Sequence, residues 1–153
     1  MARIESFRPN VLLLEPEVLS RQYVVQALQQ LAVNLRVLAT LSDADALTHD
    51  LHLIILGMDV DPADNLMRIA QARKHCPGAV VMGVCPRMTS SDRCVLLNAG
   101  LDFVLEKPFF TEECLSVIKA ILRRLSMDGL RKPQAHGLTP IQHTVITRNQ
   151  KML

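Results

Sequence analysis

Short apolar runs alternate with stretches of helical periodicity along most of this chain. Continuous apolar runs bounded by turn residues are typical of strands that are buried on both faces of a parallel sheet. The second run alternates apolar and polar residues, as a more exposed strand does. The pattern predicts five strands, at Val11–Leu14, Leu35–Thr40, Leu51–Leu56, Ala79–Cys85 and Phe103–Glu106.

Each predicted strand is followed by a segment with helix-start residues, such as proline at the first position or acids in the first turn. The last segment carries an apolar stripe that reaches Leu125, and Gly100 ends the fourth as a glycine after a helix does. Regular alternation predicts an α/β domain whose helices cover both faces of a parallel sheet. The five predicted helices begin near Pro16, Ser42–Asp45, Pro62, Ser90 or Ser91, and Thr111.

The alternation stops near residue 125, so we predict one domain over residues 9–125 and a tail over residues 126–153. Lys132-Pro133 and Gly137 predict a linker, and Thr139-Pro140 is a start signal for one short helix. The tail holds four Lys/Arg against one acid, and the whole chain has a net charge of +2. The remainder is thus near −1, and the basic tail leaves nucleic acid open as a partner beside a plain solvated extension.

Composition narrows the function classes. With 49% hydrophobic but 3% aromatic residues, the core must be aliphatic. The four cysteines are widely spaced and form no metal-binding pattern with histidine, so we predict reduced thiols, no metal and no cofactor. No leader-like or membrane-spanning apolar segment occurs, which predicts a cytoplasmic protein without a membrane partner.

Functional groups in parallel sheets gather where the strands end, here at Glu15-Pro16, Gly57, Cys85 and Lys107. The stretch from Cys85 to Asp92, then Asn98-Ala99-Gly100-Leu101-Asp102-Phe103 and Lys107-Pro108-Phe109, resembles the response-regulator receiver family. The resemblance covers residues 9–125. It implies a flavodoxin-like, doubly wound sheet of five parallel strands in the order 2-1-3-4-5 with five helices.

The resemblance also implies a site. The acids that hold Mg²⁺ in the family fall on Glu15 and Pro16, and the phospho-acceptor aspartate falls on Gly57. The hydroxyl residue of the family falls on Cys85, whereas the lysine and the switch aromatic are retained as Lys107 and Phe103. Because phosphoryl transfer needs a carboxylate nucleophile and a metal, the resemblance implies a degenerate pseudo-receiver without catalytic residues, which is not an enzyme.

Several interpretations of these positions remain open. Lys107 either keeps a functional role or only shapes the turn after the fifth strand. Asp59 and Asp61 either replace the missing acid or are solvated loop residues. A salt bridge between Asp59 and Lys107 would mimic a fixed, phosphate-independent state of the domain. Cys85 beside a cation suggests a redox sensor, and the space left by the missing aspartate suggests a small-molecule site.

The resemblance implies an atypical receiver that acts by phosphorylation-independent protein–protein interaction, in two-component signalling or transcriptional regulation in bacteria. The expected partner is a protein, and a homodimer through the face Ser91–Leu125 is our hypothesis. An alternative follows from Leu138–Ile146, which is similar to the opening helix of a LuxR-type DNA-binding domain. In that case the chain is the receiver part of a DNA-binding regulator.

Overall fold

The computed structural model describes residues 8–39 and 47–135, with side chains as far as Ser126. The chain divides into two compact units, Met1–Ile121 and Leu122–Leu153. The domain limits expected from the sequence stay a prediction. No helix within the described residues is long and apolar enough to span a lipid bilayer.

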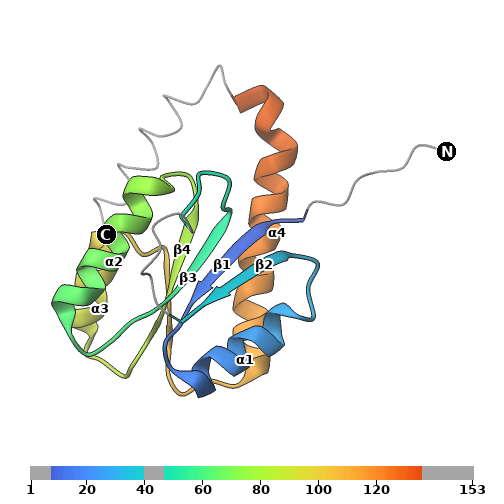
Figure 1. The fold of residues 1–153 in the computed structure, drawn as a ribbon. Helices are drawn as coiled ribbons and strands as arrows, with labels where there is room; N and C mark the ends of the chain where they lie inside the picture. The colour runs from blue at the N-terminus through green and yellow to red at the C-terminus, as the bar shows by residue number, and fades with distance from the viewer. Residues whose placement is uncertain (1–7, 40–46, 136–153) are drawn as a thin grey trace. The chain divides into compact units, whose positions relative to one another are not determined.

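The first unit is built on one sheet of five parallel strands in the order β2-β1-β3-β4-β5 (Figure 1). Apart from β2 and β5 at the edges, the strands are almost wholly buried, which fits their continuous apolar sequences. The predicted α/β class with five parallel strands is confirmed. The strands are β1 (Asn10–Leu14), β2 (Asn34–Leu38), β3 (Leu53–Gly57), β4 (Val80–Cys85) and β5 (Phe103–Glu106).

Four helices occur in the described residues, so the expectation of five is corrected. The expected helix at Ser42–Asp45 falls on residues 40–46, which lie outside the described residues. In Figure 1, α2 and α3 cover one face of the sheet, and α1 with the first part of α4 covers the other. The helices are α1 (Val18–Leu28), α2 (Pro62–His75), α3 (Ser90–Ala99) and α4 (Thr111–Ala135).

Helix boundaries follow local capping chemistry. Asp61 accepts a hydrogen bond from the Ala63 amide at 3.0 Å, with Pro62 as the first helical residue. The helix α3 begins at Ser90, near the predicted start, but Thr89 rather than Ser90 or Ser91 is its cap and accepts a hydrogen bond from the Asp92 amide at 3.1 Å. Gly100 ends α3 with a φ of 134°, a conformation that favours glycine.

The last helix is longer than the sequence pattern suggested, because α4 continues to Ala135. Leucine, methionine, arginine, lysine and glutamine favour a helix beyond residue 125. Pro133 stands in the last turn, where a proline removes one amide hydrogen bond without ending the helix earlier. Lys132-Pro133 is therefore helical rather than a linker, and the expected short helix at Leu138–Ile146 lies outside the described residues.

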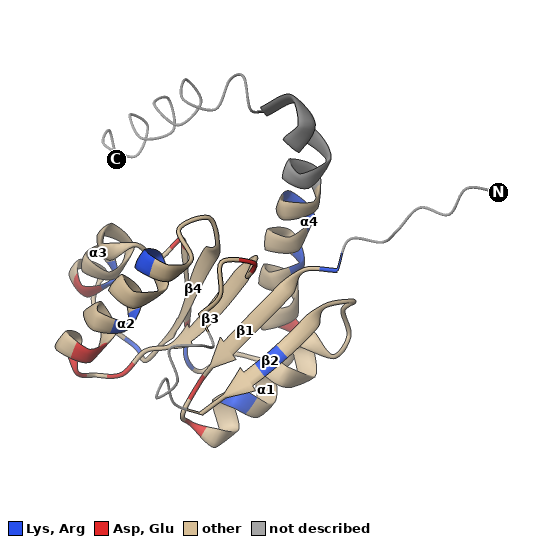
Figure 2. Ribbon diagram, turned by 45° about the horizontal axis from the view of Figure 1, so that its top comes forward, with Lys and Arg blue, Asp and Glu red and all other residues tan. Residues whose placement is uncertain are grey.

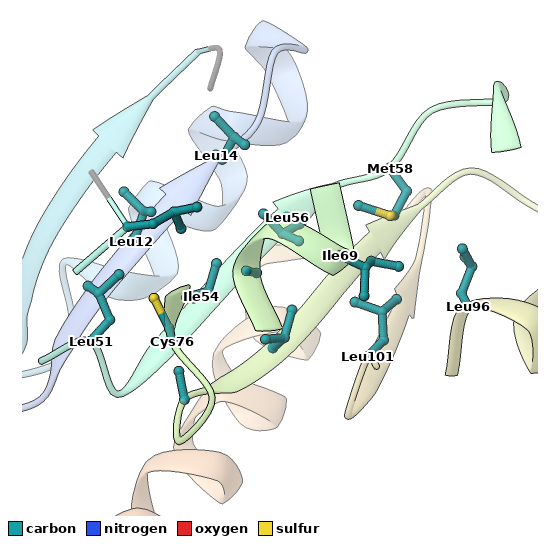
Figure 3. Packing of buried hydrophobic residues seen from close by; sticks show 14 of the residues in the cluster. Leu12, Leu14, Leu51, Ile54, Leu56, Met58, Ile69, Cys76, Leu96 and Leu101 are labelled. Atoms are coloured by element: carbon teal, nitrogen blue, oxygen red, sulfur yellow. The ribbon is translucent and has the colours of Figure 1, made fainter. Parts of the chain in front are cut away.

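The core between the sheet and the α2–α3 layer is aliphatic, as composition requires (Figure 3). Alternate strand residues point into this layer because side chains alternate between the two faces of a strand. Leu12 and Leu14 of β1 and Ile54 and Leu56 of β3 belong to the same cluster as Ile69 of α2 and Leu96 of α3. This rigid support fixes where the strands end, and hence where the candidate site lies.

Candidate functional site

The site lies at the carboxyl ends of the strands, as expected for a parallel sheet. Glu15 follows β1, Gly57 is the last residue of β3, and Lys107 follows β5. A pocket of about 360 Å³ brings these three together with Glu17 and Asp59. Neither Cys85 nor Phe103 lines this pocket. Cys85 ends β4 and is fully buried, whereas Phe103 of β5 is 44% exposed.

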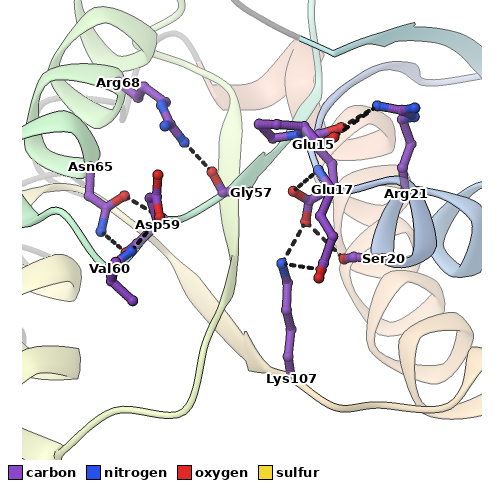
Figure 4. A network of polar contacts seen from close by, with 11 residues as sticks. Glu15, Glu17, Ser20, Arg21, Gly57, Asp59, Val60, Asn65, Arg68 and Lys107 are labelled. Atoms are coloured by element: carbon purple, nitrogen blue, oxygen red, sulfur yellow. Dashed lines mark hydrogen bonds and ion pairs between the residues drawn. The ribbon is translucent and has the colours of Figure 1, made fainter.

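The Glu15 carboxylate is 2% exposed, yet each of its oxygens has a partner. Oε1 accepts a hydrogen bond from the Ser20 hydroxyl at 2.8 Å and lies 3.2 Å from Lys107 Nζ. Oε2 accepts from the Glu17 amide at 3.2 Å (Figure 4). A buried charge is tolerated only when it is paired and hydrogen-bonded, and this network supplies both.

Gly57 allows the Glu15 carboxylate to occupy this place. A Cβ atom added to Gly57 would lie 2.8 Å from Oε1 of Glu15 and closer still to Oε2 and Cδ. The backbone does not demand glycine here, because Gly100 is the glycine with a positive φ among the described residues. The expectation that the missing aspartate leaves an empty space at Gly57 is therefore corrected. Glu15 fills the volume that a side chain at position 57 would occupy.

Lys107 is held by two carboxylates. Its Nζ lies 3.2 Å from Glu15 Oε1 and 2.8 Å from Glu17 Oε1. Burial by itself lowers the pKa of Lys107, but the hydrogen bond to Glu17 and the charge of Glu15 outweigh it and raise the pKa above the ordinary value. The ammonium therefore stays charged and engaged at neutral pH.

The expected salt bridge between Asp59 and Lys107 is wrong. The Asp59 carboxylate accepts from the Val60 amide at 2.7 Å, and its backbone is bound on both sides by the Asn65 side chain (Figure 4). Local hydrogen bonds to the start of α2 hold this loop, as they commonly do for aspartate in turns. On the same side of the pocket, Arg68 donates to the Gly57 carbonyl.

The Cys85 thiol does not have the properties of a reactive site. Burial raises its pKa to about 12, and the opposing charge of Lys107 is a smaller influence. Reactive cysteines need an accessible thiolate, which this environment disfavours. Cys114 is buried with its pKa likewise raised to about 12, and Cys94 is the one exposed cysteine of the four.

The Mg²⁺ ion that the family holds at these positions does not fit the residues of this chain. Hard cations take oxygen ligands, but Pro16 and Gly57 have no side-chain donor, and the Glu15 oxygens are bound to Lys107, Ser20 and a backbone amide. Across residues 8–39 and 47–135, no cluster of three or more potential metal-ligating side chains occurs. The arrangement is a closed charge network.

Comparison with solved structures identifies the architecture. A response regulator from Thermotoga maritima superposes with a TM-score of 0.68 over 76% of this chain and 99% of that chain, at 18% identity. The domain has the receiver fold of response regulators. An atypical orphan response regulator, described as having a phosphorylation-independent regulatory mechanism, shares this receiver fold with a TM-score of 0.62 at 20% identity, over 74% of this chain and 95% of its own.

Two curated proteins are similar to this chain in sequence. The transcriptional regulatory protein PmrA of Pectobacterium parmentieri is 28% identical over 132 residues, which is 85% of this chain and 60% of that protein. The response regulator MprA of Mycobacterium leprae is 30% identical over 95 residues, 62% of this chain and 42% of its own length. The chain therefore spans about half the length of these relatives. No protein-family model matches it.

Sequence reasoning missed three participants in this receiver site: Glu17, Ser20 and Arg68. Ser20 carried a detectable signal, because it is a polar residue at a position of α1 that faces the core. Glu17 carried a weaker one, as an acid two residues after Glu15. Arg68 lies eleven residues beyond Gly57, and the pattern of α2 does not distinguish it from a solvated arginine.

Proposed function

We propose that this chain is a pseudo-receiver, a non-enzymatic module that acts through protein–protein contacts without being phosphorylated. One observation carries the proposal: the Glu15 carboxylate fills the space over Gly57 while it binds Lys107. In this proposal Glu15, Pro16, Gly57, Cys85 and Lys107 are the degenerate phosphorylation-site positions. The receiver comparison described as phosphorylation-independent supports it by analogy.

The physical reasoning concerns charge. Phosphoryl transfer depends on an oriented nucleophile and on cations that offset phosphate charge. Gly57 offers no nucleophile, and the negative charge of Glu15 would repel a phosphoryl group that approached Lys107. The same carboxylate is paired with Lys107 in this structure. The domain thus holds one charge arrangement at this site in place of two that alternate.

The expected contact surface is the face Ser91–Leu125, formed by α3, β5 and the start of α4. Leu97, Phe103 and Phe110 are exposed on it, with Phe110 80% exposed. Aromatic residues are enriched in protein interfaces because they bury a large area with little side-chain entropy loss. We propose that this face supports a homodimer, with the switch aromatic Phe103 turned outward as a contact residue.

A second candidate is favoured by the length comparison. The relatives are longer than this chain, and one of them is a transcriptional regulatory protein. The chain would then supply the receiver part of a DNA-binding regulator, with the pseudo-receiver controlling assembly on DNA. Nucleic acid would be the partner of the output part rather than of residues 9–125.

The first test is the intact mass of the protein after incubation with acetyl phosphate and Mg²⁺. The proposal predicts no phosphoryl adduct. A stable adduct would overturn it, and Asp59→Asn and Asp61→Asn variants would show whether a displaced loop acid carries the group.

The second test is the mass in solution by light scattering. A Leu97→Asp variant should shift a dimer toward monomer, since a charge in the proposed interface must be desolvated. Met67→Asp is the matched control, because Met67 is an exposed apolar residue of α2 that lies outside the face Ser91–Leu125. A wild-type protein that is monomeric at high concentration would exclude the homodimer.

A further inference from the structure

A second groove lies between α2 and α3, next to the Glu15–Lys107 pocket, with which it shares Asp59, Val60 and Pro86. It holds about 260 Å³ and is lined by the loops that follow β3 and β4 and by both helices. Leu96 and Met88 line it as more buried residues, whereas Val60, Leu66 and Val95 line it as exposed ones. We call it the α2–α3 groove.

Three apolar side chains of this groove are exposed to solvent. Val60 is 81% exposed and Val95 is 50% exposed, and both lie on the same concave surface as Leu66. Apolar side chains gathered in a concave surface gain free energy when a partner covers them, by about 25 cal/mol per Å² of area removed from water. Such patches commonly mark interaction sites.

The charges around the groove are mainly negative. Asp59 and Asp92 line it against one cation, Arg87. Asp61 and Asp64 lie at the N-cap and in the first turn of α2, so acids gather where α2 and α3 begin (Figure 2). Arg93 of α3 does not offset them, because it pairs with Glu106 at 3.0 Å. A fitting ligand therefore presents apolar side chains together with positive charge.

This chain contains a segment of that chemistry. Residues 136–153 include two cations, Arg148 and Lys151, and no Asp or Glu. Their aliphatic residues are Leu138, Ile141, Val145, Ile146 and Leu153. We propose that the α2–α3 groove binds residues 136–153 of a second copy of this chain.

Each copy then carries both halves of the contact, the acidic apolar groove and the basic apolar segment. Such an interface is heterologous, with different surfaces on the two partners. Complementary charge favours pairing of groove with segment, while two acidic grooves repel each other. The association therefore weakens as salt concentration rises, because these charges are exposed to solvent.

The test measures the mass of the full-length chain by light scattering over a range of concentrations. We expect the mass to rise with concentration and a synthetic peptide of residues 136–153 to reverse the rise. A Leu66→Lys variant, which places a cation in the groove, should weaken association by about tenfold or more. Met67→Lys is the matched control, because Met67 is an exposed apolar residue on the same helix that does not line the groove.

Three outcomes would overturn the inference. One is a mass that does not change with concentration, which is also the result expected if the segment binds the groove of its own copy. Another is equal weakening by Leu66→Lys and Met67→Lys. The third is an association lost in Leu97→Lys but kept in Leu66→Lys, which would support the homodimer through Ser91–Leu125 and exclude the groove. Peptide binding measured separately on Leu66→Lys shows whether the groove itself is the binding site.

Discussion

Two neighbouring regions of the receiver fold differ in how their side chains are satisfied. In the cluster of Glu15, Glu17, Ser20 and Lys107, polar atoms that face the pocket bind one another. The α2–α3 groove next to it shares Asp59, Val60 and Pro86 with that pocket. Its Val60, Leu66 and Val95 side chains are exposed to water. The polar groups of the first region find their partners within the chain. The exposed apolar side chains of the second region would be stabilised by a partner that covers them.

This difference bears on the function proposed for the domain. Buried polar networks that are fully paired resist change, because breaking one contact leaves another group unsatisfied. Within the described residues, no buried side-chain nitrogen or oxygen lacks a hydrogen-bond partner. Covering an exposed apolar surface breaks no existing polar contact, so a partner can bind there without that cost. The contrast favours recognition over chemistry.

The largest loss of stability is expected when an aspartate is placed at position 57, where the receiver family has its phospho-acceptor. Gly57→Asp would place a second carboxylate against the buried Glu15. Steric overlap and unpaired like charge should lower the free energy of unfolding by about 4 kcal/mol. Urea denaturation measures it.

The control for that variant is Gly57→Asp combined with Glu15→Ala, which removes both the overlap and the repulsion. The double variant should be more stable than Gly57→Asp alone. If Gly57→Asp folds as stably as the wild type, Glu15 does not fill this space.

A smaller effect is expected from the lysine. Lys107→Met removes the cation and leaves Glu15 buried with its remaining hydrogen bonds, which should cost about 2 kcal/mol. Glu17→Gln is the matched comparison, because its carboxylate is exposed and exposed pairs contribute less than about 1 kcal/mol. Equal losses in the two variants, measured by urea denaturation, would mean that burial of Glu15 is unimportant.

The smallest effect is a pH dependence of the free energy of unfolding, which is absent at neutral pH and appears above pH 9. Burial raises the pKa values of Cys85 and Cys114 to about 12 from 9.0, so above pH 9 the unfolded thiols lose protons that the folded thiols keep. The free energy of unfolding therefore falls as pH rises from 9 towards 12. The raised pKa of Lys107 acts in the same direction: its contribution is complete below 10.5 and is lost as the pH passes through its folded value.

Thermal unfolding at a series of pH values measures this slope. Replacing Cys85 and Cys114 together by alanine should make the slope shallower. Cys94→Ala is the control that should leave it unchanged, because that thiol is exposed in the folded protein. A slope unchanged by the double replacement would show that the two thiols ionise alike in both states.

The sheet could be predicted because its signal is local. Continuous apolar runs such as Val11–Leu14 belong to strands buried on both faces, and all five runs became strands with small shifts at their ends. Boundaries were less predictable where several caps compete, as at Thr89 and Ser90. The end of α4 is harder to predict, because the Lys132-Pro133 pair is typical of a linker while the residues around it favour a helix.

The site was predicted as a set of positions but not as a network. The sequence placed Glu15, Gly57 and Lys107 at neighbouring strand ends, which the structure brings into one pocket. It did not show that the longer glutamate side chain reaches over Gly57, because side-chain reach depends on the spacing of strands in space. For the same reason Asp59 was a candidate partner of Lys107, although Asn65 holds its loop elsewhere.

The most direct test of the account is a double-mutant cycle on Gly57→Ala and Glu15→Ala. The account predicts that Gly57→Ala costs about 2 kcal/mol in the wild-type background, because its Cβ overlaps the Glu15 carboxylate. In the Glu15→Ala background the same change should cost less than about 0.5 kcal/mol. Equal costs in both backgrounds would contradict the claim that Glu15 occupies the place of the missing side chain.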